Sequence, residues 1–283
     1  MNSSNSIFYS FWFDDWATIL GILKKKGIID QYFSRTHGFD LYEERRKNGF
    51  FPFRNFQLES VKNIFAACKD GVRYLNKHYP QYSSKFYLSH LGVFDKGVNP
   101  FIKDETFTIV SCSALKQLKR VHLIVEALKK VMVNVNWIHI GNGDQKEALI
   151  SQCKQLPDNI KVEFKGHMQN NEILNFYKTH PIHLFIHLSE TEGGVPVSLQ
   201  EAASFGIPLL GTNVGGIPEI VTEETGLLIP VDVEVAEVTK FINEFKNSFR
   251  NTTEFRYRCR EFWKETFEAR KNYELFYRQL TEA

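Results

Sequence analysis

The sequence predicts an α/β protein built on an open, doubly wound parallel sheet. From Phe107 onward, apolar runs that suit strands (FTIVSC, NWIHI, VEF and IHLFIHLS) alternate with stretches of helical pattern (RVHLIVEALKKVM, DQKEALISQC and NEILNFYK). This alternation is typical of βαβ units, whose right-handed crossovers make consecutive strands parallel. The strand runs are almost continuously apolar, which indicates burial on both faces of the sheet. A ligand of such a sheet binds outside the carboxyl ends of its strands.

The first helix of this half shows the helical periodicity most clearly. Its apolar residues recur at i, i+3, i+4, i+7 and i+10, and they are Val121, Ile124, Val125, Leu128 and Val131. This spacing places them on one side of a helix. We therefore expect that side of the helix to be buried.

Composition excludes several classes of protein. The 283 residues are 43% hydrophobic, enough for one substantial core or two modest ones, and the net charge of +2 gives no field that would favour nucleic acid. The cysteines are Cys68, Cys112, Cys153 and Cys259, far apart and without a CxxC pair, which disfavours a zinc site and a disulfide framework. No apolar run reaches the roughly 18 residues that a membrane span needs. The N-terminus also lacks the basic region of a signal peptide. We expect a cytoplasmic protein, with peripheral contact with the inner face of the membrane left open.

The chain is expected to divide near residue 103. Residues 1–103 contain strand-like and helical pieces, with three strands expected, and resemble the later part of an α/β domain. The turn-forming stretch 95–104 is the predicted linker, and residues 104–253 form the regular α/β domain. Residues 254–283 are helical in pattern and are expected to pack back on the rest through their aromatic residues, which include Phe262, Trp263, Phe267, Tyr273 and Phe276.

The segment ETEGGVPVSLQE, residues 190–201, carries the clearest chemical signal. A strand ending at Ser189 leads into Gly193 and Gly194, and Pro196 then opens a helix that stops at Gly206. Proline suits the first helical position and glycine the left-handed end of a helix. Two glycines before a helix let a ligand reach its unpaired N–H groups, where the helix dipole favours an anion. A phosphate is the ligand that this pattern predicts.

Glu201 lies in the second turn of this helix. A ligand at the helix end would meet backbone donors for its phosphates and a carboxylate for its hydroxyls, a combination that fits a nucleoside diphosphate. Hydrogen bonds to charged groups contribute about 1.5 to 3 kcal/mol, more than the dipole's about 0.3 to 1. The structural alternative is a solvent-facing acidic loop before an ordinary helix.

Further glycine loops and two cations are predicted at the same edge. Gly141 and Gly143 follow the strand NWIHI, a further glycine loop covers residues 215–219, and Lys119 and Arg120 open the first helix of this half. Because each loop follows a predicted parallel strand, all of them lie along one edge of the sheet. The alternative for each is an ordinary βα loop or a solvated helix start.

The first half offers a histidine with a neighbouring glycine, in the run Arg35 to Asp40. In the functional interpretation, His37 approaches the sugar of a reacting substrate, and Gly38 allows that sugar to come close to the backbone. The alternative is a histidine that only makes structural hydrogen bonds.

Together these residues resemble glycosyltransferase family 4, the retaining enzymes of the GT-B fold. The resemblance is densest in SETEGGVPVSLQEAASFGIPLLGTNVGGIPEIV and extends to SRTHGFDLYEERR, the segment of this family's acceptor domain that carries its active-site histidine. It implies one complete Rossmann-like donor domain and a partial Rossmann-like acceptor domain. It also implies transfer of a sugar, with retention, from a UDP- or GDP-sugar to a glycan or lipid-linked acceptor hydroxyl, in bacterial surface polysaccharide or glycan synthesis.

The resemblance also implies roles for single residues. Glu201 would bind the ribose, and Glu192 with Gly193, Gly194 and Val195 the donor sugar and diphosphate. Lys119, with Arg120 beside it and the Gly141 and Gly143 loop nearby, would neutralise the diphosphate. His37 and Glu192 are the catalytic candidates. Neither a metal nor another cofactor is expected, because the chain has no DxD motif and cationic and backbone groups would replace one.

The sequence departs from the family pattern at three points. Eight residues separate Glu192 from Glu201 where the family has seven, and Ala114 stands where the family has an arginine, with Lys116 or Arg120 as substitutes. The opening strands of the acceptor domain are also missing before Met1, so we expect an N-terminally truncated chain. The incomplete acceptor half leaves open a nucleotide-sugar-binding pseudoenzyme without turnover. A GT-B-fold sugar-nucleotide epimerase is a less favoured alternative, because the segment EGGVPVSLQEA fits the transferases better.

Overall fold

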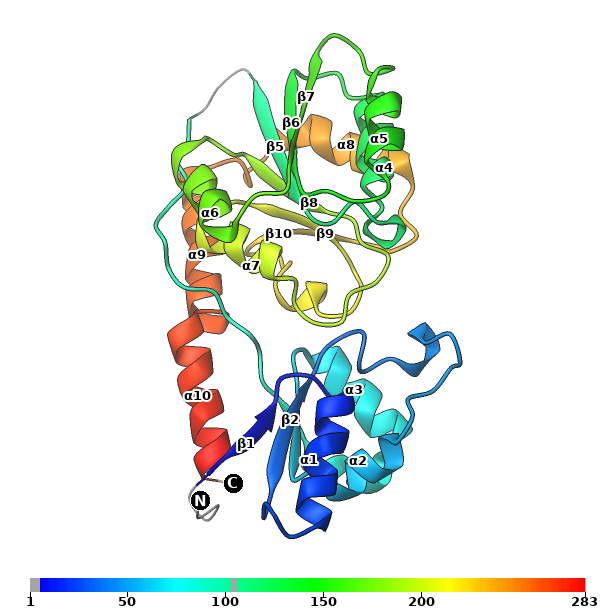
Figure 1. Ribbon diagram of the computed structural model, residues 1–283. Coiled ribbons are helices and arrows are strands. Elements are labelled where there is room, and N and C mark those ends of the chain that lie inside the picture. The colour runs from blue at the N-terminus through cyan, green and yellow to red at the C-terminus, as the bar shows by residue number, and fades with distance from the viewer. Residues whose placement is uncertain (1–5, 103–105, 283) are drawn as a thin grey trace. The chain divides into compact units, whose positions relative to one another are not determined.

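A computed structural model describes residues 6–102 and 106–282 and divides the chain into two compact units (Figure 1). The first unit contains Met1–Gly92, Glu192–Val195 and Ala269–Ala283, and the second contains Val93–Thr191 and Pro196–Glu268. Each unit has its own parallel sheet. The predicted α/β class is therefore confirmed.

The first unit is built on a four-stranded sheet of order β1-β2-β3-β4. Its strands are β1 (Phe8–Ser10), β2 (Tyr32–Thr36), β3 (Asn63–Ala66) and β4 (Phe86–Leu88). Its helices are α1 (Asp15–Lys25), α2 (Arg54–Ser60), α3 (Lys69–His78) and α10 (Ala269–Thr281), with short 3-10 turns η2 (Glu43–Arg45) and η3 (Pro80–Lys85). The sheet has four strands, so the expectation of three was wrong. The two edge strands have only three residues each, which is too short to show a periodicity in the sequence.

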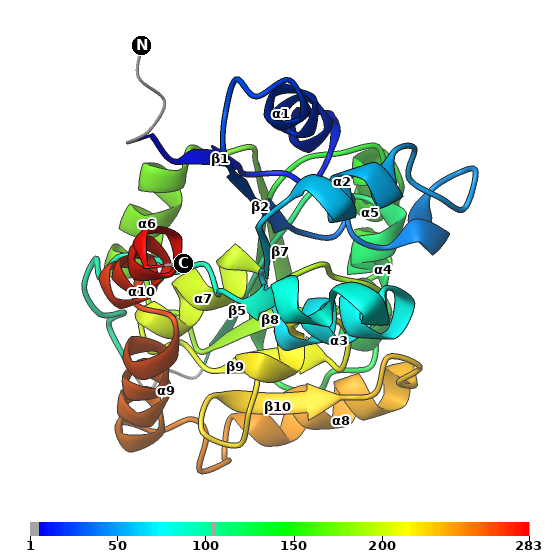
Figure 2. The same cartoon turned by 90° about the horizontal axis from the view of Figure 1, so that it is seen from below.

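The second unit has a six-stranded parallel sheet of order β10-β9-β8-β5-β6-β7, of which Figure 2 shows β10, β9, β8 and β5 in succession. Its strands are β5 (Phe107–Cys112), β6 (Val135–Ile140), β7 (Ile160–Gly166), β8 (Leu184–His187), β9 (Leu209–Thr212) and β10 (Gly226–Ile229). Its helices are α4 (Val121–Leu128), α5 (Lys146–Cys153), α6 (Asn170–Thr179), α7 (Val197–Ser204), α8 (Val235–Phe245) and α9 (Thr253–Thr266), with 3-10 turns η4 (Gln117–Lys119) and η5 (Ile217–Glu219).

The strand order of the second sheet reverses between β5 and β8. The chain runs outward from β5 to β6 and β7, then returns to β8 on the other side of β5 and continues to β9 and β10. The carboxyl ends of β5 and β8 therefore flank the switch point, where open α/β sheets bind their ligands. The predicted buried side of α4 is confirmed, since the five apolar residues from Val121 to Val131 are each at most 4% exposed.

The C-terminal segment forms two helices, α9 and α10, separated at Phe267 and Glu268. Val93 N–H donates to the Phe267 carbonyl at 3.1 Å, which fixes the break. Trp263 and Phe267 are fully buried, whereas Tyr273 is 40% exposed and covers less than expected. None of the helices in the described part of the chain combines the length and the apolar character that crossing a membrane requires.

Helix α10 is attached to the first sheet through Phe276. The Phe276 ring contacts the rings of Tyr9 at 5.2 Å and Phe65 at 5.0 Å, and the Arg35 guanidinium carbon lies 4.4 Å from its centroid. Arg35 is itself buried and donates from Nε to the Tyr9 hydroxyl at 3.1 Å. One aromatic side chain thus connects the last helix with a buried cation in the sheet.

Replacing Phe276 by Ala should lower the free energy of unfolding by about 2 kcal/mol, less than the about 3 to 5 kcal/mol of a fully buried phenylalanine, because Phe276 is only half-buried. Tyr277→Ala is the matched control, since Tyr277 is 65% exposed. Urea unfolding followed by tryptophan fluorescence measures both. Equal midpoints for the two variants would show that Phe276 does not anchor α10.

Candidate functional site

The predicted site residues fall into two groups, one in each unit. The second unit contains Lys119, Arg120, Gly141, Gly143 and Glu201. The first unit contains His37, together with Glu192, Gly193, Gly194 and Val195, which belong to it although the residues on either side belong to the second. Each group is described within its own unit.

In the second unit, the loops after β5, β6 and β8 are hydrogen-bonded to one another. Leu115 N–H donates to the Asn142 carbonyl at 3.0 Å, and Gln145 N–H donates to the Leu115 carbonyl at 3.1 Å. Glu190 N–H donates to the Leu118 carbonyl at 2.8 Å. These bonds make the carboxyl edge of the sheet one connected surface at the switch point.

Gly141 and Gly143 are required by this packing. A Cβ atom on Gly141 would lie 1.9 Å from the Ser113 carbonyl oxygen, and its φ of +138° is a conformation that other residues rarely adopt. A Cβ atom on Gly143 would lie 2.5 Å from the Leu115 carbonyl oxygen. Both glycines therefore have a structural reason that needs no ligand, and their contact with a phosphate stays a prediction.

The two cations before α4 differ in how they are held. Arg120 has a left-handed backbone (φ +48°), and its guanidinium donates to the carbonyls of Leu188 at 2.8 Å and Val231 at 2.7 Å. It thereby ties α4 to the loops after β8 and β10. Lys119, at the end of η4, is half-buried. Most of the Arg120 donors are used on backbone carbonyls, so Arg120 has little capacity left for a phosphate.

Glu201 is a buried carboxylate in α7. The residue is 5% exposed, and its Oε1 accepts a hydrogen bond from the Asn170 side chain at 2.6 Å. Burial raises the pKa of Glu201 above its ordinary value, and the bond from Asn170 opposes this only in part. Its charge also raises the pKa of Cys112, although burial of the thiol is the larger cause. An ionised carboxylate with one neutral donor retains capacity for further hydrogen bonds.

The start of α7 carries no side-chain cap. The helix begins at Val197, so Pro196 is its N-cap residue and not its first helical residue as predicted, and it offers no side-chain acceptor to the first turn. The helix ends at Ser204, and Gly206 follows with a φ of +73°, which confirms the predicted glycine stop. An uncapped helix start leaves backbone N–H groups for water or an anion.

In the first unit, His37 lies in a turn organised by Asp40. Asp40 is fully buried and its carboxylate accepts from the backbone N–H groups of His37 at 2.6 Å and Phe13 at 2.7 Å. The His37 ring lies 4.6 Å from the Phe11 ring and 4.3 Å from the Trp12 ring. Neither ring nitrogen has a hydrogen-bond partner among the described residues.

His37 is neutral at physiological pH. Burial lowers its pKa to about 4, with a smaller contribution from the Arg35 charge. A neutral imidazole with two unsatisfied nitrogens can both donate and accept a hydrogen bond. The contact of His37 with a sugar stays a prediction.

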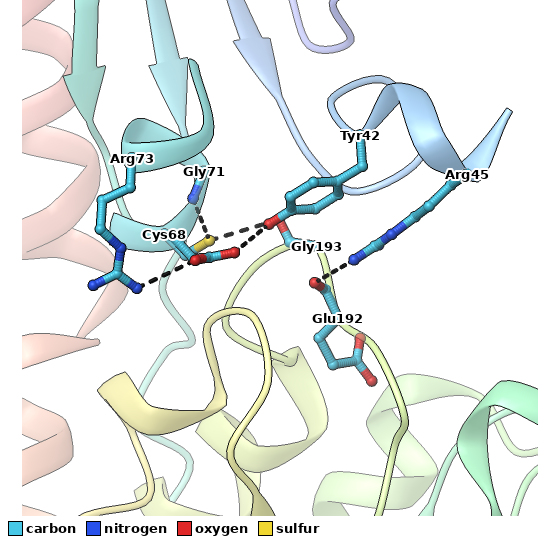
Figure 3. A network of polar contacts seen from close by, with 8 residues as sticks. Tyr42, Arg45, Cys68, Gly71, Arg73, Glu192 and Gly193 are labelled. Carbon is cyan, nitrogen blue, oxygen red and sulfur yellow. Dashed lines mark hydrogen bonds and ion pairs between the residues drawn. The ribbon is translucent and has the colours of Figure 1, made fainter. Parts of the chain in front are cut away.

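Gly38 and Gly193 meet backbone to backbone. A Cβ atom on Gly193 would lie 2.0 Å from the Gly38 Cα atom. Figure 3 shows how this segment is held: Arg45 donates to the Glu192 carbonyl at 3.2 Å, and the Cys68 thiol donates to the Gly193 carbonyl at 3.8 Å while accepting from Gly71 N–H. Glu192 is thus fixed through its backbone.

Sequence reasoning missed Asn170, Arg45 and Cys68. Asn170 begins α6, 31 residues before its partner Glu201, and no periodicity links the two. Cys68 caps α3 in a position where serine, threonine or aspartate would have been recognisable. Among the described residues, no group of three or more histidine, cysteine, aspartate and glutamate side chains is placed to hold a metal ion.

Replacing Gly141 by Ala should destabilise the chain more than replacing Gly166 by Ala. Both have positive φ, but a Cβ on Gly166 meets nothing within 4 Å, so only Gly141 adds a clash. We expect about 1 to 2 kcal/mol for Gly166→Ala from backbone strain, and about 1 to 3 kcal/mol more for Gly141→Ala. Urea unfolding measures the difference, and equal losses would contradict the loop packing.

Replacing Glu201 by Gln should stabilise the chain at neutral pH. The folded-state pKa lies above the ordinary 4.5, so ionisation costs the folded state stability as pH rises from 4.5 through the raised value. Glutamine keeps an oxygen for Asn170 without the charge. The gain should vanish below about pH 4.5, where both states are protonated.

Unfolding curves across this pH range test the prediction, with Glu244→Gln on the exposed side of α8 as the control. A Glu201→Gln variant less stable than its parent at neutral pH would show that the carboxylate supports the fold and is not a strained group kept for a ligand.

Comparison with known proteins agrees with this geometry. The family model for glycosyl transferases group 1 matches residues 96–263. The chain is 30% identical over 185 residues to N-acetyl-alpha-D-glucosaminyl L-malate synthase of Bacillus anthracis, covering 62% of the chain and 46% of the relative. It is 30% identical over 129 residues to the putative colanic acid biosynthesis glycosyltransferase WcaL of Escherichia coli K12, covering 43% and 32%. The chain spans less than half the length of these curated relatives.

Solved structures show the same fold at low identity. The Anabaena protein Alr3699/HepE, crystallised with UDP and glucose, matches with a TM-score of 0.79 at 15% identity, over 98% of this chain and 78% of that chain. The lipopolysaccharide outer core galactosyltransferase WaaB matches with a TM-score of 0.76 at 16% identity, over 96% and 75%. The predicted GT-B architecture is thereby confirmed. With its second unit matched almost throughout, the chain belongs to the group 1 glycosyl transferases.

Proposed function

We propose that this protein transfers a sugar, with retention of configuration, from a nucleoside-diphosphate sugar to an acceptor hydroxyl. The observation that carries the proposal is the buried Glu201 carboxylate, which lies in α7 with one neutral donor. HepE, which shares the fold, was crystallised with UDP and with UDP-glucose. The proposal includes an acceptor part in residues 1–103, a donor part in residues 104–253 and a C-terminal helical segment in 254–283.

Ribose hydroxyls are the donors that Glu201 lacks. Burying a carboxylate is unfavourable unless hydrogen bonds compensate for lost water, and Asn170 supplies one such bond. The two neighbouring hydroxyls of a ribose would supply two more donors, from which the second carboxylate oxygen of Glu201 could also accept. The resulting charge-assisted bonds are stronger than those between neutral groups.

The diphosphate would be neutralised by Lys119 and by backbone N–H groups at the uncapped start of α7. Gly141 and Gly143 keep the neighbouring loop close to the sheet edge, and Arg120 fixes the loops after β8 and β10. In this proposal Arg120 positions the site and Lys119 contacts the ligand. Charge that develops on the departing phosphate would be stabilised by groups already in place.

In the first unit, His37 and the Glu192–Val195 segment would contact the donor sugar. His37 is neutral, so it serves as a hydrogen-bonding group for a sugar hydroxyl and not as a general acid. The bond between the anomeric carbon and the phosphate oxygen breaks, the acceptor oxygen forms the new bond on the same face, and the leaving phosphate takes the acceptor proton. No protein nucleophile is needed for this path, and orientation supplies much of the rate.

We further propose that the product is a bacterial surface polysaccharide or a related glycan, with WcaL and the O-antigen biosynthesis glycosyltransferase WbnH of Escherichia coli as the supporting relatives. The acceptor would be a glycan or a lipid-linked sugar. A second candidate is a nucleotide-sugar-binding protein without turnover, which would share the proposed ribose contact of Glu201. Sugar transfer by this chain alone would reject that candidate.

Calorimetric titration of UDP and GDP into the chain tests the proposed binding. Glu201→Ala should weaken the preferred nucleotide by about tenfold or more, since a charge-assisted hydrogen bond contributes about 1.5 to 3 kcal/mol. Glu244→Ala, an exposed glutamate on α8, is the matched control and should leave the affinity unchanged. No affinity for either nucleotide in a folded sample, or equal affinity for both variants, would refute the proposal.

A further inference from the structure

The first unit contains a hollow of about 470 Å³ that the proposed nucleotide site does not use. It lies between the start of α1, the residue that follows Gly38, and the loop that precedes α2. Aromatic rings and polar side chains line it together, among them Phe39, Phe50, Asp15, Arg46, Lys47 and Gln57. A concave surface of this size with a few polar groups among aromatic ones is typical of a small-ligand site.

Gln57 gives this hollow a built polar wall. The residue is 2% exposed, and its side-chain nitrogen donates to the Asp14 carbonyl and to the Thr18 hydroxyl, both at 2.8 Å. These two acceptors fix which end of the amide carries the nitrogen. Its side-chain oxygen then has no hydrogen-bond partner among the described residues. A buried acceptor without a donor is unfavourable, and because this oxygen lies just below the surface, the wall must shift locally for it to meet a donor.

Aromatic rings are unusually exposed at the same place. Phe50 is 54% exposed and Phe39 is 47% exposed, and both line the hollow. The Arg46 guanidinium lies over the rings of Phe39 and Phe51, at 5.6 Å and 4.5 Å from their centroids, and holds this loop against the turn that contains His37. The exposed parts of these rings, largest at Phe50, suit a ligand with an apolar face.

The charges around the hollow nearly balance. The negative charges of Asp14 and Asp15 offset the positive charges of Arg46 and Lys47. The surface is therefore not a basic patch that would bind an anionic membrane or a polyphosphate. The carboxylates accept hydrogen bonds, Arg46 and Lys47 donate them, and the phenyl rings pack on C–H groups. A pyranose ring presents hydroxyls around its rim and C–H groups on its face, and so meets all of these requirements.

We propose that this hollow binds a saccharide. If the function proposed above holds, on which this part rests, the saccharide is the acceptor. The connection runs through Trp12, whose ring lies 4.7 Å from Phe39 in the hollow and 4.3 Å from His37. Asp40 supports both places, since it accepts from the N–H groups of Phe13, which lines the hollow, and of His37. The acceptor class is therefore a sugar, and not a bare lipid or a peptide.

Ligand-observed saturation-transfer NMR on the whole chain tests this proposal with glucose, galactose, N-acetylglucosamine and their common disaccharides as probes. At least one probe should receive saturation, most strongly at the C–H protons that face the rings. Phe50→Ala and Asp15→Asn should each weaken its binding about tenfold, as loss of a ring contact or of a charge-assisted hydrogen bond implies. Both residues are exposed, so the variants should fold, and circular dichroism checks this.

Phe53→Ala is the matched control. Phe53 lies in the same loop and is 66% exposed, but it does not line the hollow, so saccharide binding should be unchanged. No saturation transfer to any probe, or equal binding by the Phe50→Ala and Phe53→Ala variants, would overturn the proposal.

The same samples separate this site from the proposed nucleotide site. Glu201→Ala should lose affinity for UDP or GDP and keep saccharide binding. Phe50→Ala should lose saccharide binding and keep its affinity for the nucleotide. Saccharide binding by a chain that binds neither nucleotide would uphold the hollow and refute the proposed function. Nucleotide binding without saccharide binding would uphold the proposed nucleotide site and refute the saccharide site in the hollow.

Discussion

The loops that carry the site residues are packed backbone against backbone, at separations that leave no room for a Cβ atom. Gly141 lies against the Ser113 carbonyl in the second unit, and Gly193 lies against Gly38 in the first. Because peptide groups in such contact cannot slide without breaking their hydrogen bonds, the loops keep fixed positions at the strand ends. His37 precedes Gly38 directly, so this packing also fixes the backbone beside it.

Two buried carboxylates differ in how the protein satisfies them, and this difference is why a ligand is proposed for only one of them. Asp40 accepts from Phe13 N–H, His37 N–H and the Thr36 hydroxyl, so the protein itself satisfies the carboxylate. Glu201 accepts from Asn170. Burial raises the pKa of both. The difference in internal donors, and not the shared burial, separates a structural carboxylate from one with capacity for ribose hydroxyls.

Much of the second unit could be predicted from the sequence because its strands are buried on both faces and appear as apolar runs. Phe107–Cys112, α4 and the glycine stop of α7 were each recognisable from periodicity or from turn chemistry. The three-residue strands β1 and β4 carry no such signal. The direction of the Arg120 guanidinium, toward the Leu188 and Val231 carbonyls, depends on contacts across the sheet edge that no local pattern encodes.

Hydrogen exchange with and without UDP or GDP is the most direct test of the central claim, that the carboxyl edge of the second sheet binds a nucleoside diphosphate. Amides in the loop after β5, in the Gly141 loop and in the first turn of α7 should exchange more slowly with bound nucleotide, because they donate to phosphates or lose solvent. The surface of α8 should not change. Protection confined to other parts of the chain, or no protection at saturating nucleotide, would contradict the claim.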